Sequence, residues 1–127
     1  MALYEKASDE VIVSFAHFEE SGFGSHPVWW AYVAEIDNII RGFALYYIRY
    51  STWKGQRMYL EDFYVEPEFR GFGIGSLLFE KLIEKAKKQQ FNGIVWQALE
   101  WNEPALNFYR KYNAKFDNEW INCSLDF

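Results

Sequence analysis

Residues 59–76 read Tyr59-Leu60-Glu61-Asp62-Phe63-Tyr64-Val65-Glu66-Pro67-Glu68-Phe69-Arg70-Gly71-Phe72-Gly73-Ile74-Gly75-Ser76. A strand-like run ends at a proline, crosses an Arg-x-x-Gly-x-Gly turn and opens directly into an amphipathic helix. Glycines at such a junction let backbone N–H groups converge on an anion, and the helix dipole favours negative charge at the same point. The segment therefore predicts a strand, a turn and a helix with an anion site at the helix N-terminus.

The glycine spacing separates this turn from the two common phosphate loops. A Walker A loop requires Gly-Lys-Ser/Thr after its glycines, whereas here Gly75 is followed directly by Ser76, with no lysine. The dinucleotide fingerprint requires G-x-G-x-x-G, whereas Gly71, Gly73 and Gly75 alternate strictly. The pattern closely resembles the pyrophosphate loop of the GNAT acetyltransferase superfamily. A plain glycine-rich turn is the alternative, and the neighbouring arginine and a second motif further along the chain argue against it.

Composition sets the class of protein and its partners. A chain of 127 residues fits a single domain, residues 1–127. Half of the residues are hydrophobic, and 12 Phe, 9 Tyr and 6 Trp supply a core with aromatic surface to spare for a pocket or a subunit contact. The net charge of −5 makes a nucleic-acid partner unexpected and favours a cationic ligand, although a solvated acidic surface gives the same sum.

Few residues in the sequence suit a metal or a disulfide. Cys123 is the single cysteine, so it forms no internal disulfide, and a packed core position is expected for it. His17 and His26 have no partner at a metal-ligand spacing, so no metal is predicted. No signal peptide and no long apolar run is present, which predicts a cytoplasmic protein without a membrane partner.

The pattern of apolar residues predicts an α/β (α+β) fold, with helices packed on a mixed sheet. Asp37-Asn38 is a good hairpin turn between the first two strands, and Ser8-Asp9 offers a cap for a leading helix. The expected elements are a helix over 9–20, strands over 29–35, 40–49 and 56–65, a helix from 75 to about 90, a strand over 93–99, a helix from 102 to about 112 and a strand over 119–125.

A second motif begins the last helix. Asn102-Glu103-Pro104 places a good N-cap residue before a proline in the first turn, and a helix cap alone would explain that tripeptide. Tyr109 follows Asn102 by two helical turns and is therefore expected on the same helix face.

These motifs together resemble the spermidine/spermine (diamine) N-acetyltransferase branch of the GNAT superfamily. The likeness extends over nearly the whole chain and includes the Gly22–Pro27 loop and Ala44-Leu45-Tyr46-Tyr47. It implies a twisted mixed sheet whose central parallel strands, ending near Val65 and Leu99, splay apart to admit the pantetheine of acetyl-CoA. It also implies transfer of an acetyl group to a primary amine of a polyamine or similar small amine, by direct attack through a ternary complex, and a homodimer.

The resemblance assigns residues to cofactor and substrate. The implied cofactor contacts are Phe63, Tyr64, Val65, Arg70, Gly71, Phe72, Gly73, Ile74, Gly75, Ser76, Asn102, Glu103, Pro104, Ala105 and Tyr109. The implied substrate contacts are Tyr4, Glu5, Glu61, Trp96, Gln97 and Glu119.

Two residues are the candidate catalytic groups. An ammonium with a pKa of about 10.4 must lose a proton before its nitrogen attacks a thioester, and Glu61 is the candidate general base, acting through a water. Adjacent strand residues point to opposite faces, so only one of Glu61 and Asp62 is expected in the cleft; a solvated carboxylate is the alternative for Glu61. Tyr109, with a phenol pKa of about 10, is the candidate donor to the leaving thiolate, and a buried aromatic is its alternative. A backbone N–H near residues 63–65 is expected to hold the oxyanion.

One departure from the family concerns the N-terminus. The resemblance implies a further strand and most of a helix before Met1, so the chain is expected to be N-terminally short, with strand or domain swapping in the dimer. Two other functions stay open. One is acetylation of thialysine, an amino acid or another small amine, and the other is a truncated, non-catalytic acetyl-CoA-binding module.

Overall fold

The structure, a computed structural model, describes residues 13–127. Tyr4, Glu5 and the expected cap Ser8-Asp9 lie outside the described residues. The chain divides into two compact units, which meet between Gln97 and Ala98 in the sequence. Each unit is described by itself below.

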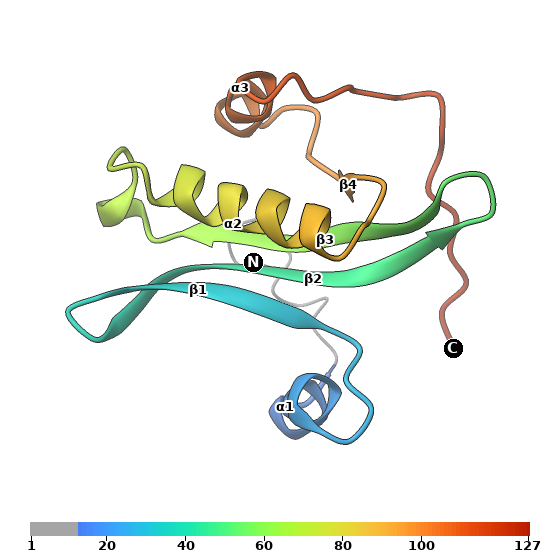
Figure 1. The fold of residues 1–127 in the computed structure, drawn as a ribbon, viewed down its shortest axis with the longest axis horizontal. Coiled ribbons are helices and arrows are strands. Elements are labelled where there is room, and N and C mark those ends of the chain that lie inside the picture. Colours follow the sequence, from blue (N-terminus) through green and yellow to red (C-terminus); the bar gives the residue numbers. More distant parts are fainter. Residues whose placement is uncertain (1–12) are drawn as a thin grey trace. The chain divides into compact units, whose positions relative to one another are not determined.

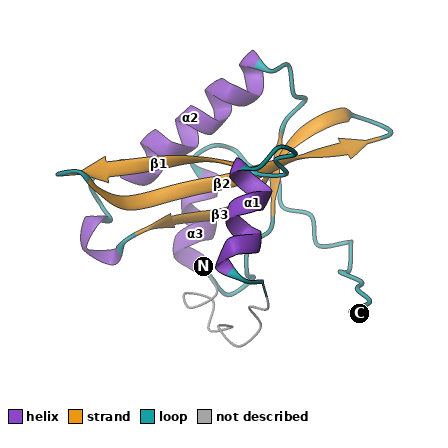
Figure 2. Cartoon of the chain, turned by 90° about the horizontal axis from the view of Figure 1, so that it is seen from below, coloured by secondary structure: helices purple, strands orange, loops and turns teal. Residues whose placement is uncertain are grey.

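The first unit is built on a four-stranded sheet of strands β1 (Trp30–Ile36), β2 (Ile39–Ser51), β3 (Gly55–Val65) and β4 (Ile94–Trp96), in that spatial order (Figures 1 and 2). The first two junctions are antiparallel and the last, between β3 and β4, is parallel. The predicted mixed sheet is therefore confirmed. Asp37 and Asn38 both have positive φ, of 54° and 65°, as a tight two-residue hairpin requires.

Helix α2 (Ile74–Lys88) lies along one face of this sheet (Figure 1). Its buried residues recur at helical spacing: Ile74, Leu78, Phe79, Leu82 and Ala86. Ile74 and Leu78 pack in one cluster with Val65 at the end of β3. This packing fixes the glycine turn between β3 and α2, because both of its ends belong to the same core.

Helix α1 (Phe15–Phe23) starts later than expected. The hydroxyl oxygen of Ser14 caps it by accepting a hydrogen bond from the His17 N–H at 3.1 Å. The ring of Phe18 stacks on Trp29, with centroids 4.7 Å apart. The expected range of 9–20 is thus corrected to 15–23 for the described residues, since Ser14 is the N-cap and the helix continues to Phe23, with Gly24 as its C-cap.

The second unit contains helix α3 (Glu103–Arg110), close to the range expected for it. Two expectations here are wrong. Residues 119–125 form no strand, and Trp120 and Ile121 are 80% and 85% exposed; alternating apolar residues make a strand only when a neighbouring strand completes the ladder. Cys123 is exposed and not packed in a core, for the same reason. None of the helices in the described part of the chain is long and apolar enough to cross a membrane.

Candidate active site

The two parallel strands of the first unit are paired only over a short stretch. Their ladder runs from Met58 opposite Ile94 to Leu60 opposite Trp96 and ends there. Strand β3 continues to Val65, paired on its other side with β2, while β4 ends at Trp96 and not at Leu99 as expected. The C-terminal half of β3 thus runs on beyond its ladder with β4, at the place where the family resemblance implies that the two strands part.

Glu61 lies at a β-bulge on β3. Leu45 is opposite Asp62 and the next residue, Tyr46, is opposite Leu60, so Glu61 is the extra residue between them. A bulge bends the strand and re-aims side chains, and bulges are over-represented beside active sites. The Glu61 side chain is exposed and Asp62 is partly buried. Strict alternation, on which the sequence argument for these two residues depended, does not hold across this bulge.

Two stacked tyrosines lie next to Glu61 on the sheet. Tyr47 and Tyr59 are directly opposite each other, with ring centroids 4.9 Å apart. Burial raises the pKa of both hydroxyls above 10.0; the charge of Glu61 raises each pKa further, and the cation of Arg49 opposes this. The guanidinium of Arg49 lies over the Tyr59 ring, 5.7 Å from its centroid. A carboxylate and a cation therefore both act on this tyrosine pair.

The glycine turn opens helix α2 in the way the sequence predicted. Gly71 and Gly73 have φ of 87° and 84°, a left-handed conformation that favours glycine. No side chain caps the helix at Gly73. A Cβ added at either glycine would meet nothing within 4 Å. The backbone at this helix N-terminus is therefore left open to a ligand, and Gly75 and Ser76 form the first turn behind it.

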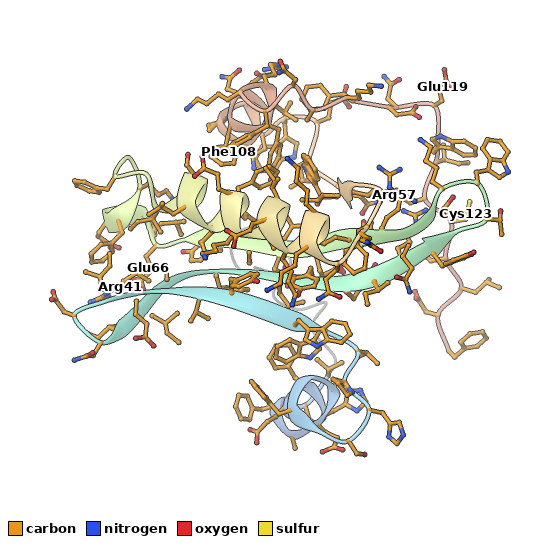
Figure 3. All side chains as sticks on the ribbon, in the orientation of Figure 1. Arg41, Arg57, Glu66, Phe108, Glu119 and Cys123 are labelled. Atoms are coloured by element: carbon orange, nitrogen blue, oxygen red, sulfur yellow. The ribbon has the colours of Figure 1, made fainter. Side chains whose placement is uncertain are left out.

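Two arginines form contacts that hold the segment leading into the glycine turn. The Nε of Arg70 donates to the Val65 carbonyl at 2.7 Å, so this side chain is directed back toward β3. Arg41 forms a 2.9 Å ion pair with Glu66 and lies over the ring of Phe69, 4.6 Å from its centroid. Figure 3 shows Arg41 and Glu66 next to each other, at the end of the sheet where β3 ends. These contacts anchor the short 3-10 helix Pro67–Phe69 that leads into the glycines.

In the second unit, Asn102 begins helix α3 as expected. Its side-chain oxygen accepts from the Ala105 N–H at 3.4 Å, and Pro104 occupies the first turn. Tyr109, two turns further on, is buried, with 7% of its surface exposed, and its ring meets Phe108 edge-on. Glu103 is tied to Arg110 by a 3.3 Å ion pair. The same helix therefore carries both a satisfied cap and a buried phenol.

The remaining substrate candidates are spread over the chain. Trp96 packs edge-on against Phe79 of α2, 5.5 Å between centroids, while Gln97 is exposed at the end of the first unit. Glu119 is exposed in the second unit, where its N–H donates to Asp117. Tyr4 and Glu5 lie outside the described residues. Within residues 13–127, no group of three or more His, Cys, Asp or Glu side chains is arranged to hold a metal ion.

The first unit thus combines a strand, β3, that runs beyond its parallel ladder, a carboxylate at a bulge on that strand and an open glycine turn at the start of α2. The chain belongs to the acetyltransferase (GNAT) family, whose sequence model matches residues 3–114. The predicted family and fold are therefore confirmed, and the chain is an N-acetyltransferase.

Individual relatives show which acetyltransferases the chain is similar to. Thialysine N-epsilon-acetyltransferase of Bos taurus is 40% identical over 123 residues, which are 91% of this chain and 72% of that protein. Spermidine/spermine N(1)-acetyltransferase-like protein 1 of Homo sapiens is 31% identical over 90% of this chain, but only 17% of that protein is covered. Among solved structures, an aminoglycoside acetyltransferase from an uncultured soil metagenomic sample matches with a TM-score of 0.80 at 18% identity, covering 99% of this chain and 82% of that one, and shows the shared fold.

Proposed function

We propose that this chain transfers the acetyl group of acetyl-CoA to a primary amine of a polyamine or similar small amine, by direct attack in a ternary complex. The observation that carries the proposal is the open helix start at Gly73, which follows a bulged strand bearing Glu61. The relative that acts, by its name, on thialysine supports a small amine as the acceptor.

The cofactor is proposed to lie on the glycine turn. Arg70 to Ser76 would hold its pyrophosphate, through backbone N–H groups from Gly71 onward, because the Arg70 N–H already donates to the Pro67 carbonyl at 3.2 Å. A Cβ added at Gly71 or Gly73 would meet nothing within 4 Å, which leaves the room that this needs. Phe63 to Val65 would form hydrogen bonds with the pantetheine amides along β3. The other proposed cofactor contacts are Asn102 to Ala105 and Tyr109. Bound there, acetyl-CoA supplies the activated thioester.

Glu61 is proposed to take the proton from the ammonium, through a water. Its exposed position at the bulge suits a base that must meet solvent and substrate. Tyr109 is proposed to donate a proton to the departing sulfur. A proton donor must be held in a fixed position, and Tyr109 is a buried residue of a helix. A backbone N–H near residues 63–65 would stabilise negative charge on the attacked carbonyl oxygen. Trp96, Gln97, Glu119, Tyr4 and Glu5 remain proposed substrate contacts.

The chain is further proposed to act as one domain in a cytoplasmic homodimer, with strand or domain swapping. Strand β1 is an edge of the described sheet, and Val33, Ile39 and Ile40 at its hairpin are about half exposed. Such an edge is a natural place for another copy to pair. Light scattering on the purified chain measures this, and a monomer at all concentrations would contradict it.

The test of the function is acetyl-CoA consumption by this 127-residue chain with spermidine, spermine, putrescine, thialysine and lysine in separate assays. Wild type is expected to turn over at least one of these amines, and Glu61→Gln to lose roughly 100-fold or more in kcat/KM. Asp62→Asn, the adjacent carboxylate, is the matched control and should retain most activity. Binding of acetyl-CoA without turnover of any amine would instead favour a non-catalytic acetyl-CoA-binding module.

A further inference from the structure

Hydrogen bonds join two elements at one end of the first unit: the end of the β2–β3 hairpin and the segment that follows α2. The Asn92 N–H donates to the Gln56 carbonyl at 3.0 Å, and the Met58 N–H donates to the Gly93 carbonyl at 3.0 Å. The side-chain amide of Asn92 donates to the Lys54 carbonyl. The charges of the hairpin and of the last turn of α2 therefore gather at the same end of this unit.

The charged side chains at this end are all positive. Neither residues 38–60 nor residues 85–99 contain an Asp or a Glu. Within residues 13–127, none of the cations at this end forms an ion pair. Together they make up the basic end: Arg49, Lys54, Arg57, Lys85, Lys87 and Lys88. The chain as a whole carries a net charge of −5, so the basic end has the opposite sign to the molecule that bears it.

The dipole of α2 accounts for only part of the basic end. Its three lysines lie in the last turn of the helix, where positive charge is favourable. The hairpin cations Arg49 and Lys54 are exposed on strands, which have no such dipole to offset. Arg57 adds charge only, because its guanidinium lies against Gly93. Like charges gathered without counter-charges repel one another, and an anionic partner would relieve that repulsion.

The hairpin extends past the rest of the sheet as a two-stranded ribbon (Figures 1 and 2). Strand β1 pairs with β2 no further along than Tyr46, and β4 pairs with β3 only from Met58 onward. Within the described sheet, residues 47–57 are thus paired only with each other. A projecting ribbon of this kind can meet a flat surface without interference from the neighbouring strands.

The tip of the ribbon presents aromatic side chains to solvent. Trp53 and Tyr50 have 92% and 72% of their surface exposed. The turn that carries them is held by Ser51, whose hydroxyl oxygen accepts from the Trp53 N–H at 3.2 Å and from the Lys54 N–H at 3.1 Å. Trp53 is therefore presented by an ordered turn, with positive charge beside and behind it.

We propose that the basic end docks peripherally on a lipid bilayer with anionic headgroups, and that Trp53 enters the membrane–water interface. Trp and Tyr are enriched at that interface, since each has an apolar ring and a polar group. Clusters of about four to eight Lys and Arg residues bind anionic lipids, which the cytoplasmic leaflet carries. A site for single-stranded nucleic acid would instead set its aromatic residues within a positively charged groove. Here the aromatic side chains stand at the tip of a projecting ribbon.

Docking at the basic end would leave the proposed cofactor site open to water. Gly73 and the last-turn lysines lie at opposite ends of α2, whose 15 residues span about 22 Å. Figure 3 labels Arg57 at one end of the sheet and Arg41 with Glu66 at the other. The inference goes beyond the proposed acetyl transfer and does not depend on it.

The test is sedimentation of the chain with vesicles of phosphatidylcholine, alone or mixed with phosphatidylserine. Wild type is expected to sediment with the mixed vesicles and not with phosphatidylcholine alone. Raising the salt from about 0.1 M to 1 M should release it, because the Debye length falls from about 10 Å to 3 Å. Calorimetric binding of acetyl-CoA, measured without vesicles, checks that each variant is folded.

Lys87→Gln removes one exposed charge of the basic end and should weaken vesicle binding about fivefold. Lys81→Gln is the matched control, since Lys81 is also exposed on α2 but pairs with Glu84 at 3.7 Å. It should bind vesicles more nearly as wild type does. Trp53→Ala should weaken binding by about fivefold or more, and Trp53→Phe, which keeps an aromatic ring, should recover part of that loss.

The opposite results would overturn the inference. They are equal sedimentation with both kinds of vesicle, no sedimentation with either, or equal losses in Lys87→Gln and Lys81→Gln. Tighter binding to a single-stranded RNA homopolymer than to the mixed vesicles would also overturn it, in favour of a nucleic-acid surface. Acetyl transfer in solution should be unchanged in Lys87→Gln and Trp53→Ala, so a failure of the proposed function would leave the vesicle experiment decisive.

Discussion

Helices α2 and α3 are both proposed to touch the cofactor with their first turns, yet they begin in opposite ways. At α2, the N-cap residue Gly73 has no side chain, adopts a left-handed conformation and has open space around it. At α3, the side chain of Asn102 accepts from the Ala105 N–H. A helix start leaves several backbone N–H groups without an intrahelical partner. The chain satisfies one of them with a side chain at α3, whereas no side chain caps the start of α2.

The difference indicates that the two helices would contribute to the site in different ways. A glycine N-cap costs a little stability, roughly a few tenths of a kcal/mol compared with a good capping side chain. Retaining glycine at α2 is reasonable where an anion supplies the missing acceptor when it binds. The capped start of α3 needs no ligand to be stable, so its contribution is expected in the position of its side chains, Tyr109 above all.

The largest effect is expected at the start of α2. In Gly73→Leu, a side chain would occupy the space assigned to the pyrophosphate, and acetyl-CoA affinity should fall roughly 100-fold or more, which is about 2.7 kcal/mol. Calorimetric titration with acetyl-CoA measures it. The backbone there is left-handed, so the substitution also strains the chain, by about 1–2 kcal/mol.

Gly55→Leu is the control for that strain. Gly55 also has positive φ, 76°, but lies in the turn between β2 and β3, away from the glycine turn. It should lose at least as much stability, because a Cβ at Gly55 would also lie 3.2 Å from the Asn92 Nδ2, and it should keep its affinity for acetyl-CoA. Retained binding in Gly73→Leu would show that α2 does not begin at the cofactor, and the contrast between the two helices would then have no functional meaning.

The next effect is expected at Tyr109. Tyr109→Phe should reduce turnover by about 10- to 100-fold with little change in acetyl-CoA affinity, because a positioned proton donor acts on the chemical step and not on binding. Tyr112→Phe removes a hydroxyl three residues further on and should leave turnover near that of wild type. Steady-state rates and calorimetry together separate the two quantities. Unchanged turnover in Tyr109→Phe would exclude it as the proton donor.

Much of the fold followed from local patterns in the sequence. The glycine turn, the hairpin at Asp37-Asn38 and the cap at Asn102 were all predicted, because a residue type at each position is fixed by its own backbone conformation. The strand expected over 119–125 does not form. Its apolar residues alternate as a strand requires, but a strand also needs a partner, which no local pattern reports.

The candidate site was predictable only where it depends on one segment. Glu61 was identified, but its bulge was not, because the extra residue appears only when β2 and β3 are aligned. Cross-strand alignment of that hairpin is the signal that would have found the bulge.

A smaller effect is expected where the start of α2 is braced. Arg41→Gln breaks the 2.9 Å ion pair with Glu66 and the contact with Phe69, and should cost about 1 kcal/mol of unfolding free energy, since both charged side chains are still partly exposed to water. Affinity for acetyl-CoA should fall a few-fold, because the turn is less firmly held. Chemical denaturation measures the first quantity and calorimetry the second.

Lys81→Gln is the control for Arg41→Gln. It breaks the 3.7 Å pair between Lys81 and Glu84, whose side chains are mostly exposed, and such surface pairs contribute little. Its stability should remain near that of wild type. If both variants behave alike, the arginine brace adds nothing beyond an ordinary surface ion pair, and the open turn holds its shape through the glycines and the core alone.

The smallest effect is expected at the start of α3, where Asn102 has two separable roles. As a cap it needs an oxygen acceptor, which Asn102→Asp keeps and Asn102→Ala removes, so only the alanine variant should lose stability, by about 1 kcal/mol. As a proposed cofactor contact it needs an N–H donor, which both variants lack. Asn102→Asp should therefore unfold like wild type but bind acetyl-CoA a few-fold more weakly. Wild-type affinity in the aspartate variant would mean that Asn102 only caps α3 and does not contact the cofactor, so that of the two helix starts only that of α2 would bind acetyl-CoA.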